Sequence, residues 1–271
     1  MRAALLVAAL LLLAVVTPRA TGTVPLRVCA DPNNLPFSNE RGEGFENRLA
    51  EMVAREMGTR VEYVWRAQRR GFLRETLNAG ACDVVMGYAA GAGPAQTTTP
   101  YYRSTYVFVT RTSRHLAIDS FEAAELRRLR IGVQVIGDDG VNSPPAHALS
   151  RRGLASNLVG YSVYGDYRTD SPPARIVNAV ASGDVDVAAV WGPLAGYFAA
   201  REREPLRLAA VHPQSDAGLP QVFDIAMAVR RGDLARLERL ERFIRERRGA
   251  IDSLLAGYRV PRVEASGAVR W

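Results

Sequence analysis

Short apolar runs alternate with amphipathic stretches through the first third of the chain. The apolar runs have the length and composition of buried strands, and turn-forming residues bound them. The intervening stretches repeat their apolar side chains with a helical period, as in residues 46–57. The predicted strands and helices follow in the order β-α-β-α-β, at residues 26–30, 46–57, 61–65, about 70–78 and 82–87. This order is typical of a parallel sheet covered by helices.

The same alternation starts again after residue 100 and predicts a second α/β unit. Its strands and helices are expected at residues 106–110, 121–128, 129–133, 146–151, 172–181, 185–191 and 193–203. A further strand at 223–230 and an amphipathic helix at 233–247 follow this unit. We expect both of these to return to the first unit.

The fold class expected from this order is α/β, with two Rossmann-like lobes joined by two hinge strands around a cleft. A length of 271 residues exceeds the roughly 100 to 200 residues of a usual domain, which also favours two lobes. Lobe 1 is predicted to comprise residues 23–109 and 224–271, and lobe 2 residues 110–223. The crossing strands, at 106–111 and 224–230, are expected to pair with each other.

The N-terminal segment has the features of a secretory signal. Arg2 precedes an unbroken apolar run at residues 3–16, and Thr-Pro-Arg-Ala follows at 17–20. A membrane anchor is the alternative, but 14 apolar residues are fewer than the roughly 20 that span a bilayer. We therefore predict a signal peptide at 1–22 and a periplasmic protein without a membrane anchor.

Composition and charge argue against several classes of function. The net charge of +7 arises from arginines that are scattered along the chain, and no basic run is interleaved with aromatic residues. Nucleic-acid binding is therefore not expected. The three histidines lack metal-ligand spacing, and the motifs of hydrolases, metalloproteases and nucleotide-binding enzymes are missing. We expect no metal, no cofactor and no enzymatic activity. A catalytic protein of this fold would need a carboxylic acid in the cleft, for which Asp31, Glu46 and Asp166 are the candidates.

Two cysteines, Cys29 and Cys82, leave two possibilities open. An oxidising compartment favours a disulfide between them. Both lie on predicted buried strands, however, and the strand register could hold them more than about 7 Å apart as free thiols.

The candidate cleft residues come from the loops at the carboxyl ends of the predicted strands, where open α/β sheets bind ligands. These loops span residues 31–37, 87–90, 134–140 and 191–193. The polar and aromatic candidates in or near them are Asp31, Asn33, Asn34, Phe37, Trp65, Tyr88, Tyr164, Asp166 and Trp191. Asx residues beside prolines also close turns, and aromatic rings also pack in cores, so these structural roles stay open.

Several motifs resemble those of bacterial periplasmic solute-binding proteins of the amino-acid-binding type. They include Leu-Arg-Val at 26–28, Gly-Phe-Glu at 44–46 and Thr-Thr-Pro-Tyr-Tyr at 98–102. A closer resemblance is to the J proteins of methanol oxidation operons, carried by the stretches at 27–39, 68–72, 100–106 and 190–197. This resemblance implies a type II binding-protein fold and a periplasmic partner, a quinoprotein methanol or alcohol dehydrogenase that uses pyrroloquinoline quinone. The cytochrome c of that system is a further candidate partner.

One departure from the amino-acid binders bears on function. The resemblance implies an arginine shortly before Thr-x-Pro-Tyr-Tyr, where a guanidinium would hold the ligand carboxylate. Residues 91–96 read Gly-Ala-Gly-Pro-Ala-Gln instead, and Arg103 comes only after the tyrosines. We therefore expect an accessory protein that binds the dehydrogenase, or a segment of it, in or near the cleft and assists its maturation or activation. The alternative is a receptor that delivers a small amino-acid-like or organic solute to an ABC transporter.

Overall fold

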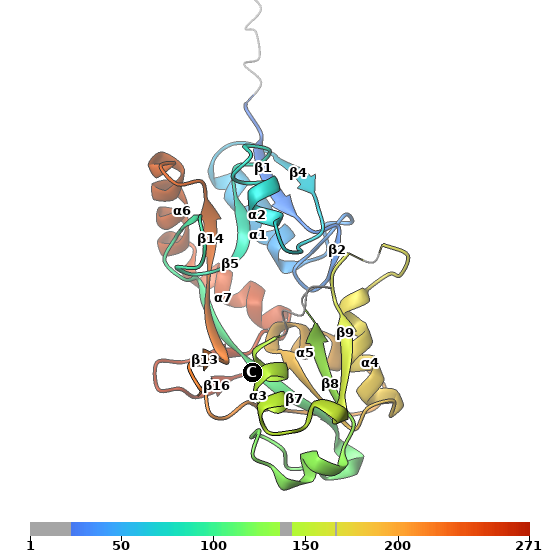
Figure 1. Ribbon diagram of the computed structural model, residues 1–271. Helices are drawn as coiled ribbons and strands as arrows, with labels where there is room; N and C mark the ends of the chain where they lie inside the picture. The colour runs from blue at the N-terminus through green and yellow to red at the C-terminus, as the bar shows by residue number, and fades with distance from the viewer. Residues whose placement is uncertain (1–22, 136–142, 166) are drawn as a thin grey trace, which may run out of the picture.

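The computed structural model describes residues 23–135, 143–165 and 167–271. Figure 1 shows two lobes, one above the other, with a long strand running between them. In the described ranges no helix is both long enough and apolar enough to cross a bilayer. The predicted signal peptide at 1–22 and the candidate Asp166 lie outside these ranges.

Lobe 1 is built on parallel strands formed by the apolar runs near the N-terminus. β1 (Leu26–Ala30) pairs in parallel with β4 (Val61–Trp65). On its other side β1 meets the chain directly before β5 (Val85–Ala89) through a parallel bridge. β14 (Val222–Val229) pairs antiparallel with β5, so a strand from the C-terminal part of the chain completes this lobe.

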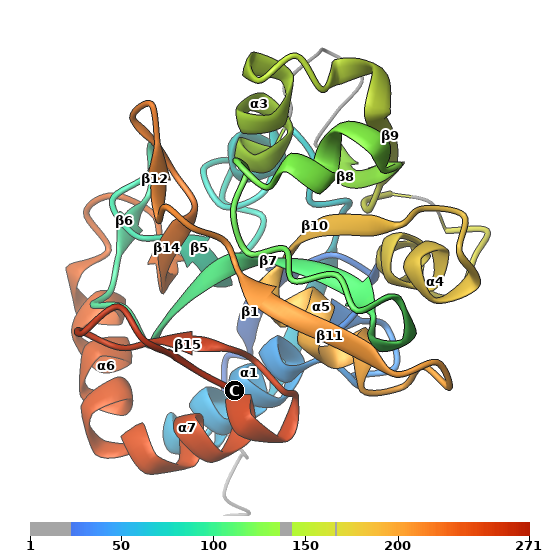
Figure 2. The same ribbon diagram turned by 90° about the horizontal axis from the view of Figure 1, so that it is seen from below.

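Helix α1 (Phe45–Glu56) covers one face of these strands. Its buried apolar side chains recur every three to four residues and so share one side of the helix: Phe45, Leu49, Ala50 and Val53. Two C-terminal helices, α6 (Leu234–Glu246) and α7 (Arg248–Gly257), contact α1, as Figure 2 shows from below. The first and last parts of the described chain therefore share one core.

Lobe 2 contains a second sheet, in which β10, β8 and β9 run in parallel and β7 lies antiparallel to β10. Its strands are β7 (Tyr102–Arg111), β8 (Ile131–Val135), β9 (Leu158–Ser162), β10 (Val187–Trp191) and β11 (Leu206–Ala210). Its helices are α3 (Pro144–Arg151), α4 (Arg175–Ser182) and α5 (Gly192–Ala199). The elements expected at 106–110, 146–151, 172–181 and 185–191 are present in this lobe, while β9 and β11 were not expected.

Strand β7 belongs to both sheets. Residues 102–105 pair with 222–225 of β14, while the following residues pair with β10 on one side and β11 on the other. The two predicted crossing strands therefore do pair, but the paired residues 102–105 precede the expected 106–111, and only 224 and 225 of the paired residues 222–225 lie in the expected 224–230. The reason is that 106–111 already lies between two strands of lobe 2. The limits of the lobes at 109/110 and 223/224 remain predictions.

Each lobe has its own hydrophobic core. The core of lobe 1 combines Phe45 and Tyr101 with Met227, Leu240 and Ile251, all nearly inaccessible to solvent. The sheet of lobe 2 has a hydrophobic core on each face. The buried residues of one core all lie between positions 108 and 211, whereas the other core also includes Leu35. The two-lobed α/β fold is thus the one that the sequence pattern predicted.

Three expected helices are shorter than predicted, and the one expected at 193–203 is α5, which ends at Ala199. In the expected helix at 70–78, only Phe72–Glu75 (α2) is α-helical, because Thr76 leaves the helical region with φ −121° and ψ −84°. In the range 121–128, only Ala124–Arg128 forms a helical turn, and it is a 3₁₀ helix. There the side-chain amide of Asn157 donates to the carbonyl oxygens of Leu126, Arg127 and Leu129, groups that a longer α-helix would use internally.

Short elements complete the described chain. The two-residue strands are β2 (Asn33–Asn34), β3 (Ser38–Asn39), β6 (Gln96–Thr97), β12 (Ser215–Asp216), β13 (Leu219–Pro220), β15 (Arg262–Val263) and β16 (Val269–Arg270). Further 3₁₀ turns span Thr112–Arg114, Ala155–Asn157 and Pro172–Ala174. The hairpin of β15 and β16 follows α7, and none of these three elements was expected from the sequence.

Cys29 and Cys82 form a disulfide, which resolves the two possibilities left by the sequence. Their Cα atoms are 5.6 Å apart. Cys29 lies in β1, but Cys82 precedes β5 rather than lying on a strand. Both are buried in a small cluster with Leu77 and Val85. The bond therefore joins β1 to the start of β5 inside lobe 1.

Candidate functional site

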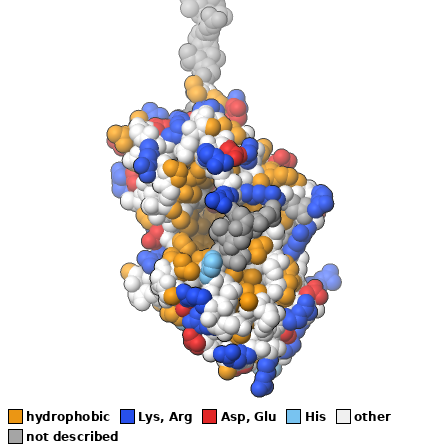
Figure 3. Space-filling view, in the orientation of Figure 1, with side chains coloured by type: hydrophobic (Ala, Val, Ile, Leu, Met, Phe, Trp, Pro, Cys, Tyr) orange, Lys and Arg blue, Asp and Glu red, His pale blue; other side chains and the backbone are white. Residues whose placement is uncertain are grey.

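Two adjoining cavities lie between the lobes and share much of their lining. Their volumes are about 300 and 210 Å³. The shared residues are Asn34, Phe37, Gln68, Ala89, Tyr164, Trp191 and Ile225. We call the two cavities together the cleft pocket. Figure 3 shows a hollow lined with hydrophobic side chains between the lobes.

Strand ends supply most of this lining, as expected for an open α/β sheet. Ala89 and Trp191 are the last residues of β5 and β10. Asn34 and Phe37 follow β1, and Gln68 follows β4. The carboxyl ends of strands from both lobes therefore meet at the cleft pocket.

Aromatic rings form one wall of the larger cavity. The ring of Trp191 stands edge-on to Tyr106, with centroids 5.2 Å apart, and to Phe223 at 5.8 Å. The backbone N–H of Trp191 donates to the side-chain oxygen of Gln134 at 2.7 Å, which ties the end of β10 to β8. Edge-to-face contact is a favoured arrangement of aromatic pairs. The wall is thus a surface of mutually packed aromatic rings.

Asp31 shapes the loop that follows β1. It is almost fully buried, and its carboxylate accepts the backbone N–H groups of Asn33 at 2.9 Å and Gln68 at 2.8 Å. Burial raises the pKa of Asp31, while these two hydrogen bonds oppose the rise. Asp31 therefore positions the loops of β1 and β4 relative to each other, which is the turn role that the sequence left open.

Asn34 and Gln68 present polar groups to the cleft pocket. The amide of Asn34 donates to the side-chain oxygen of Gln68 at 3.0 Å. The side-chain oxygen of Asn34 is buried without a partner among the described residues. An acceptor is therefore available for a ligand group that donates a hydrogen bond.

Glu46 lines the smaller cavity, together with Gly87 and Tyr102. The side chain of this second residue of α1 has no hydrogen bond or ion pair to any described residue, although the residue is only 8% exposed. Burial raises the pKa of Glu46 to about 8. A Cβ at Gly87 would come within 2.0 Å of Glu46 Oε1, so the carboxyl group rests directly on the Gly87 backbone.

The lobes touch across one side of the cleft. The side-chain amide of Asn33 donates to the carbonyl oxygen of Thr169 at 2.6 Å. The guanidinium of Arg69 donates to the carbonyl oxygens of Tyr164 and Gly165 at 3.2 and 3.1 Å. These contacts fasten the loops of β1 and β4 in lobe 1 to the segment after β9 in lobe 2.

Five candidates from the sequence line the cleft pocket: Asn34, Phe37, Tyr88, Tyr164 and Trp191. Asp31 and Asn33 lie next to it and organise its loops. Trp65 instead stacks on Tyr63, with ring centroids 4.4 Å apart, and is not a lining residue. From the sequence, Gly87, Ala89 and Gln134 were placed in the cleft loops, and Glu46 was named only as a possible acid in the cleft. The lining residues that were not selected are Gln68, Tyr102, Tyr106, Val163, Leu194, Phe223 and Ile225.

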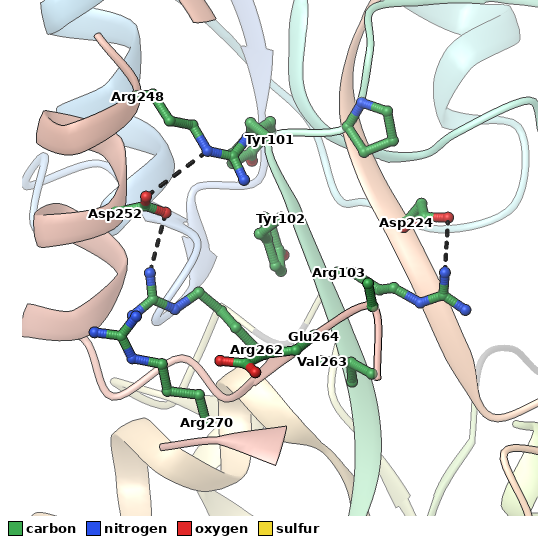
Figure 4. Close-up of a pocket in the computed structure, with 12 residues that line it drawn as sticks. Tyr101, Tyr102, Arg103, Asp224, Arg248, Asp252, Arg262, Val263, Glu264 and Arg270 are labelled. Carbon is green, nitrogen blue, oxygen red and sulfur yellow. Dashed lines mark hydrogen bonds and ion pairs between the residues drawn. The ribbon is translucent and has the colours of Figure 1, made fainter. Parts of the chain in front are cut away.

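Arg103 lies in a different pocket, shown in Figure 4, between β7 and the C-terminal segment. Its guanidinium is 3.7 Å from the carboxylate of Asp224. Asp252 is flanked there by Arg248 at 3.7 Å and Arg262 at 3.0 Å. No arginine is among the described residues that line the cleft pocket. The cleft pocket thus lacks, within the described chain, the guanidinium that would hold an amino acid's carboxylate.

No family model matches the chain. Protein MoxJ of Paracoccus denitrificans is 28% identical over 266 residues, covering 94% of this chain and 95% of that protein. Protein MoxJ of Methylorubrum extorquens is 32% identical over 243 residues, covering 87% of this chain and 81% of that protein.

Solved structures agree with these relatives. MxaJ of Methlophaga aminisulfidivorans superposes with a TM-score of 0.76 at 27% identity, covering 88% of this chain and 99% of that one. XoxJ of Methylobacterium extorquens, a periplasmic binding protein, has a TM-score of 0.71 at 30% identity, with the same coverage. The type II binding-protein fold is common to all three chains. By fold and by sequence identity over most of its length, the chain belongs to the MoxJ family.

Proposed function

We propose that this protein is a periplasmic accessory protein of a methanol or alcohol oxidation system. The cleft pocket holds a segment of the quinoprotein dehydrogenase and thereby assists the maturation or activation of that enzyme. The observation that carries the proposal is a cleft with a wall of packed aromatic rings and without an arginine among its described lining residues. Membership of the MoxJ family supports it.

The shape and chemistry of the cleft pocket suit a peptide segment better than a free amino acid. A free amino acid carries a carboxylate, and burying that charge without a paired cation is costly. A peptide segment has neutral backbone amides, and the unpaired acceptor on Asn34 is suited to one of their N–H groups. The rings of Trp191, Tyr106 and Phe223 can contact an apolar side chain at low entropic cost, as aromatic anchors do at interfaces.

Titration calorimetry tests the proposal directly. The purified protein is titrated with the apo form of the quinoprotein dehydrogenase and, separately, with a panel of amino acids and small organic acids. We expect saturable heat with the dehydrogenase alone. Tight binding of a small solute with no response to the dehydrogenase would identify an ABC-transporter receptor instead.

A pair of variants localises the binding to the cleft. Trp191→Ala removes the centre of the aromatic wall, and we expect roughly thirtyfold weaker dehydrogenase binding, the effect of losing an interface anchor. Trp271→Ala is the matched control, because Trp271 is 54% exposed at the C-terminus and does not line the cleft pocket. Equal losses in both variants, or none in either, would contradict a role for the cleft.

A further inference from the structure

The smaller cavity of the cleft pocket combines one buried carboxyl group with several aromatic rings. Glu46 lines it together with the rings of Phe37, Tyr88, Tyr102 and Tyr164. None of the described residues offers the Glu46 side chain a hydrogen bond or an ion pair, yet that side chain lines an open cavity. Buried carboxyl groups are normally paired, so an unpaired one that faces a cavity calls for a partner from outside the chain.

A cation satisfies both features of this cavity. A carboxylate provides charge-assisted hydrogen bonds to a guanidinium or ammonium group, and aromatic faces attract the same groups. The described lining contains no competing arginine or other positive charge. The cavity measures about 210 Å³ and shares much of its lining with the adjoining larger cavity, so a side chain can enter it from a segment that lies in the larger one.

We propose that Glu46 is the counter-ion for an arginine or lysine side chain, which the dehydrogenase segment inserts into the smaller cavity of the cleft pocket. This inference rests on the proposed function for the source of the cation. It goes further by naming the chemical group that the cleft recognises and the residue that recognises it.

The groups that face Glu46 explain why its charge depends on such a ligand. Among the described residues, four tyrosines interact electrostatically with Glu46: Tyr63, Tyr101, Tyr102 and Tyr164. Each of these is uncharged at neutral pH, so none of them stabilises the carboxylate. With a pKa of about 8, Glu46 is mostly protonated at neutral pH without a ligand. A bound cation would favour the carboxylate, and binding would then release a proton.

Two blocked amino acids test the inference without the dehydrogenase. Nα-acetyl-arginine amide carries a guanidinium but no carboxylate, and Nα-acetyl-citrulline amide is its neutral isostere. At pH 8.5 we expect the arginine compound to bind about ten- to a hundredfold more tightly than the citrulline compound. Equal affinities would overturn the inference.

Variants assign the preference to one residue. In Glu46→Gln we expect the two compounds to bind alike, while Glu51→Gln, on the same helix and outside the cleft pocket, keeps the wild-type preference. A preference that survives in Glu46→Gln would overturn the inference. The wild-type protein provides a second test, because lowering the pH below about 8 should reduce the preference by up to tenfold for each pH unit. A preference that is constant with pH would also contradict the role of Glu46.

The dehydrogenase experiment separates this inference from the proposed function. If the dehydrogenase fails to bind the wild-type protein, the proposed function is wrong, whatever the model compounds show. If it binds wild type and Glu46→Gln equally, the function stands and the inserted cation is refuted. If free arginine binds far more tightly than its blocked form, the cation comes from a solute, which overturns the assignment to a protein segment.

Discussion

Replacing Glu46 by Gln should reveal an energetic cost that the wild-type protein carries at high pH. The pKa of Glu46 is about 8 in the folded protein, against 4.5 for a solvent-exposed glutamate. Between these two values the folded protein holds a proton that the unfolded chain has released. Rising pH therefore destabilises the wild type across this window and has no further effect through Glu46 above it. At 1.36 kcal/mol for each pH unit, the full effect reaches about 5 kcal/mol.

Glutamine keeps the shape of the protonated side chain and cannot ionise. The Glu46→Gln variant should therefore match the wild type near pH 4.5 and exceed it by up to about 5 kcal/mol at pH 9. Other titrating groups are common to both proteins, so the difference between them isolates Glu46. The side-chain amide of the variant must fit where Glu46 Oε1 packs against the Gly87 backbone. Any steric cost of this replacement is the same at every pH, so it does not affect the pH dependence of the difference.

Urea unfolding followed by tryptophan fluorescence at pH 5, 7 and 9 measures this difference by linear extrapolation. Urea is preferred to guanidinium chloride, because guanidinium is itself a cation of the kind that Glu46 is proposed to bind. A difference in unfolding free energy that stays constant across the three pH values would refute the reasoning. It would mean that Glu46 is ionised throughout, with a stabilising group beside it.

Three further predictions follow from other parts of the structure. Replacing Cys29 and Cys82 by Ala should lower the free energy of unfolding by about 4 kcal/mol, because the bond spans 53 residues; urea curves of wild type with and without reductant should show a similar loss. Hydrogen bonds from arginines at the end of α3 lower the pKa of Asp216, so Asp216→Asn should cost about 1 to 3 kcal/mol at pH 7. That cost should shrink as the pH falls below 4, because the Asp216 carboxylate is then protonated. A cost that persists at pH 2 would contradict a stabilising role of the ionised carboxylate. Gly87→Ala should displace the Glu46 carboxyl and lower stability by about 1 to 3 kcal/mol, and Glu46→Ala added to it should restore part of that loss in thermal unfolding.

The strands that were predicted well are short runs with at most one charged residue, as in β1, β4 and β10. β9 has no buried residue and contains a glycine and a serine, so its sequence carries a weaker signal. β11 has nearly the sequence pattern of β1, and it differs in burial rather than in the order of apolar and charged residues. α7 was missed because the predicted amphipathic helix ended at Arg247, although Ile251, Leu254 and Leu255 have helical spacing directly after it.

The cleft residues can likewise be divided into those that were predicted and those that were missed. Asn34, Phe37 and Trp191 were found because they lie at or after the carboxyl ends of parallel strands. Phe223 belongs to an antiparallel strand, to which that rule does not apply. Alternation along β7 could have placed Arg103 on the face opposite Tyr102, since successive side chains of a strand point to opposite faces. The isolation of Glu46 had no sequence signal, because it depends on what surrounds a side chain in three dimensions.

The order in which the chain is synthesised gives the shared core of lobe 1 a consequence for folding. Phe45 and Leu49 are made early, but their partners Leu240, Phe243 and Ile251 are made last. Until then, the apolar face of α1 is only partly covered, and the edge of β5 awaits β14. Lobe 2 has a core that lies wholly between positions 108 and 211, so it can fold while the C-terminal helices are still being made. We expect nascent chains to pass through a stage with lobe 2 folded and lobe 1 open, in which an exposed strand edge invites aggregation and chaperone binding.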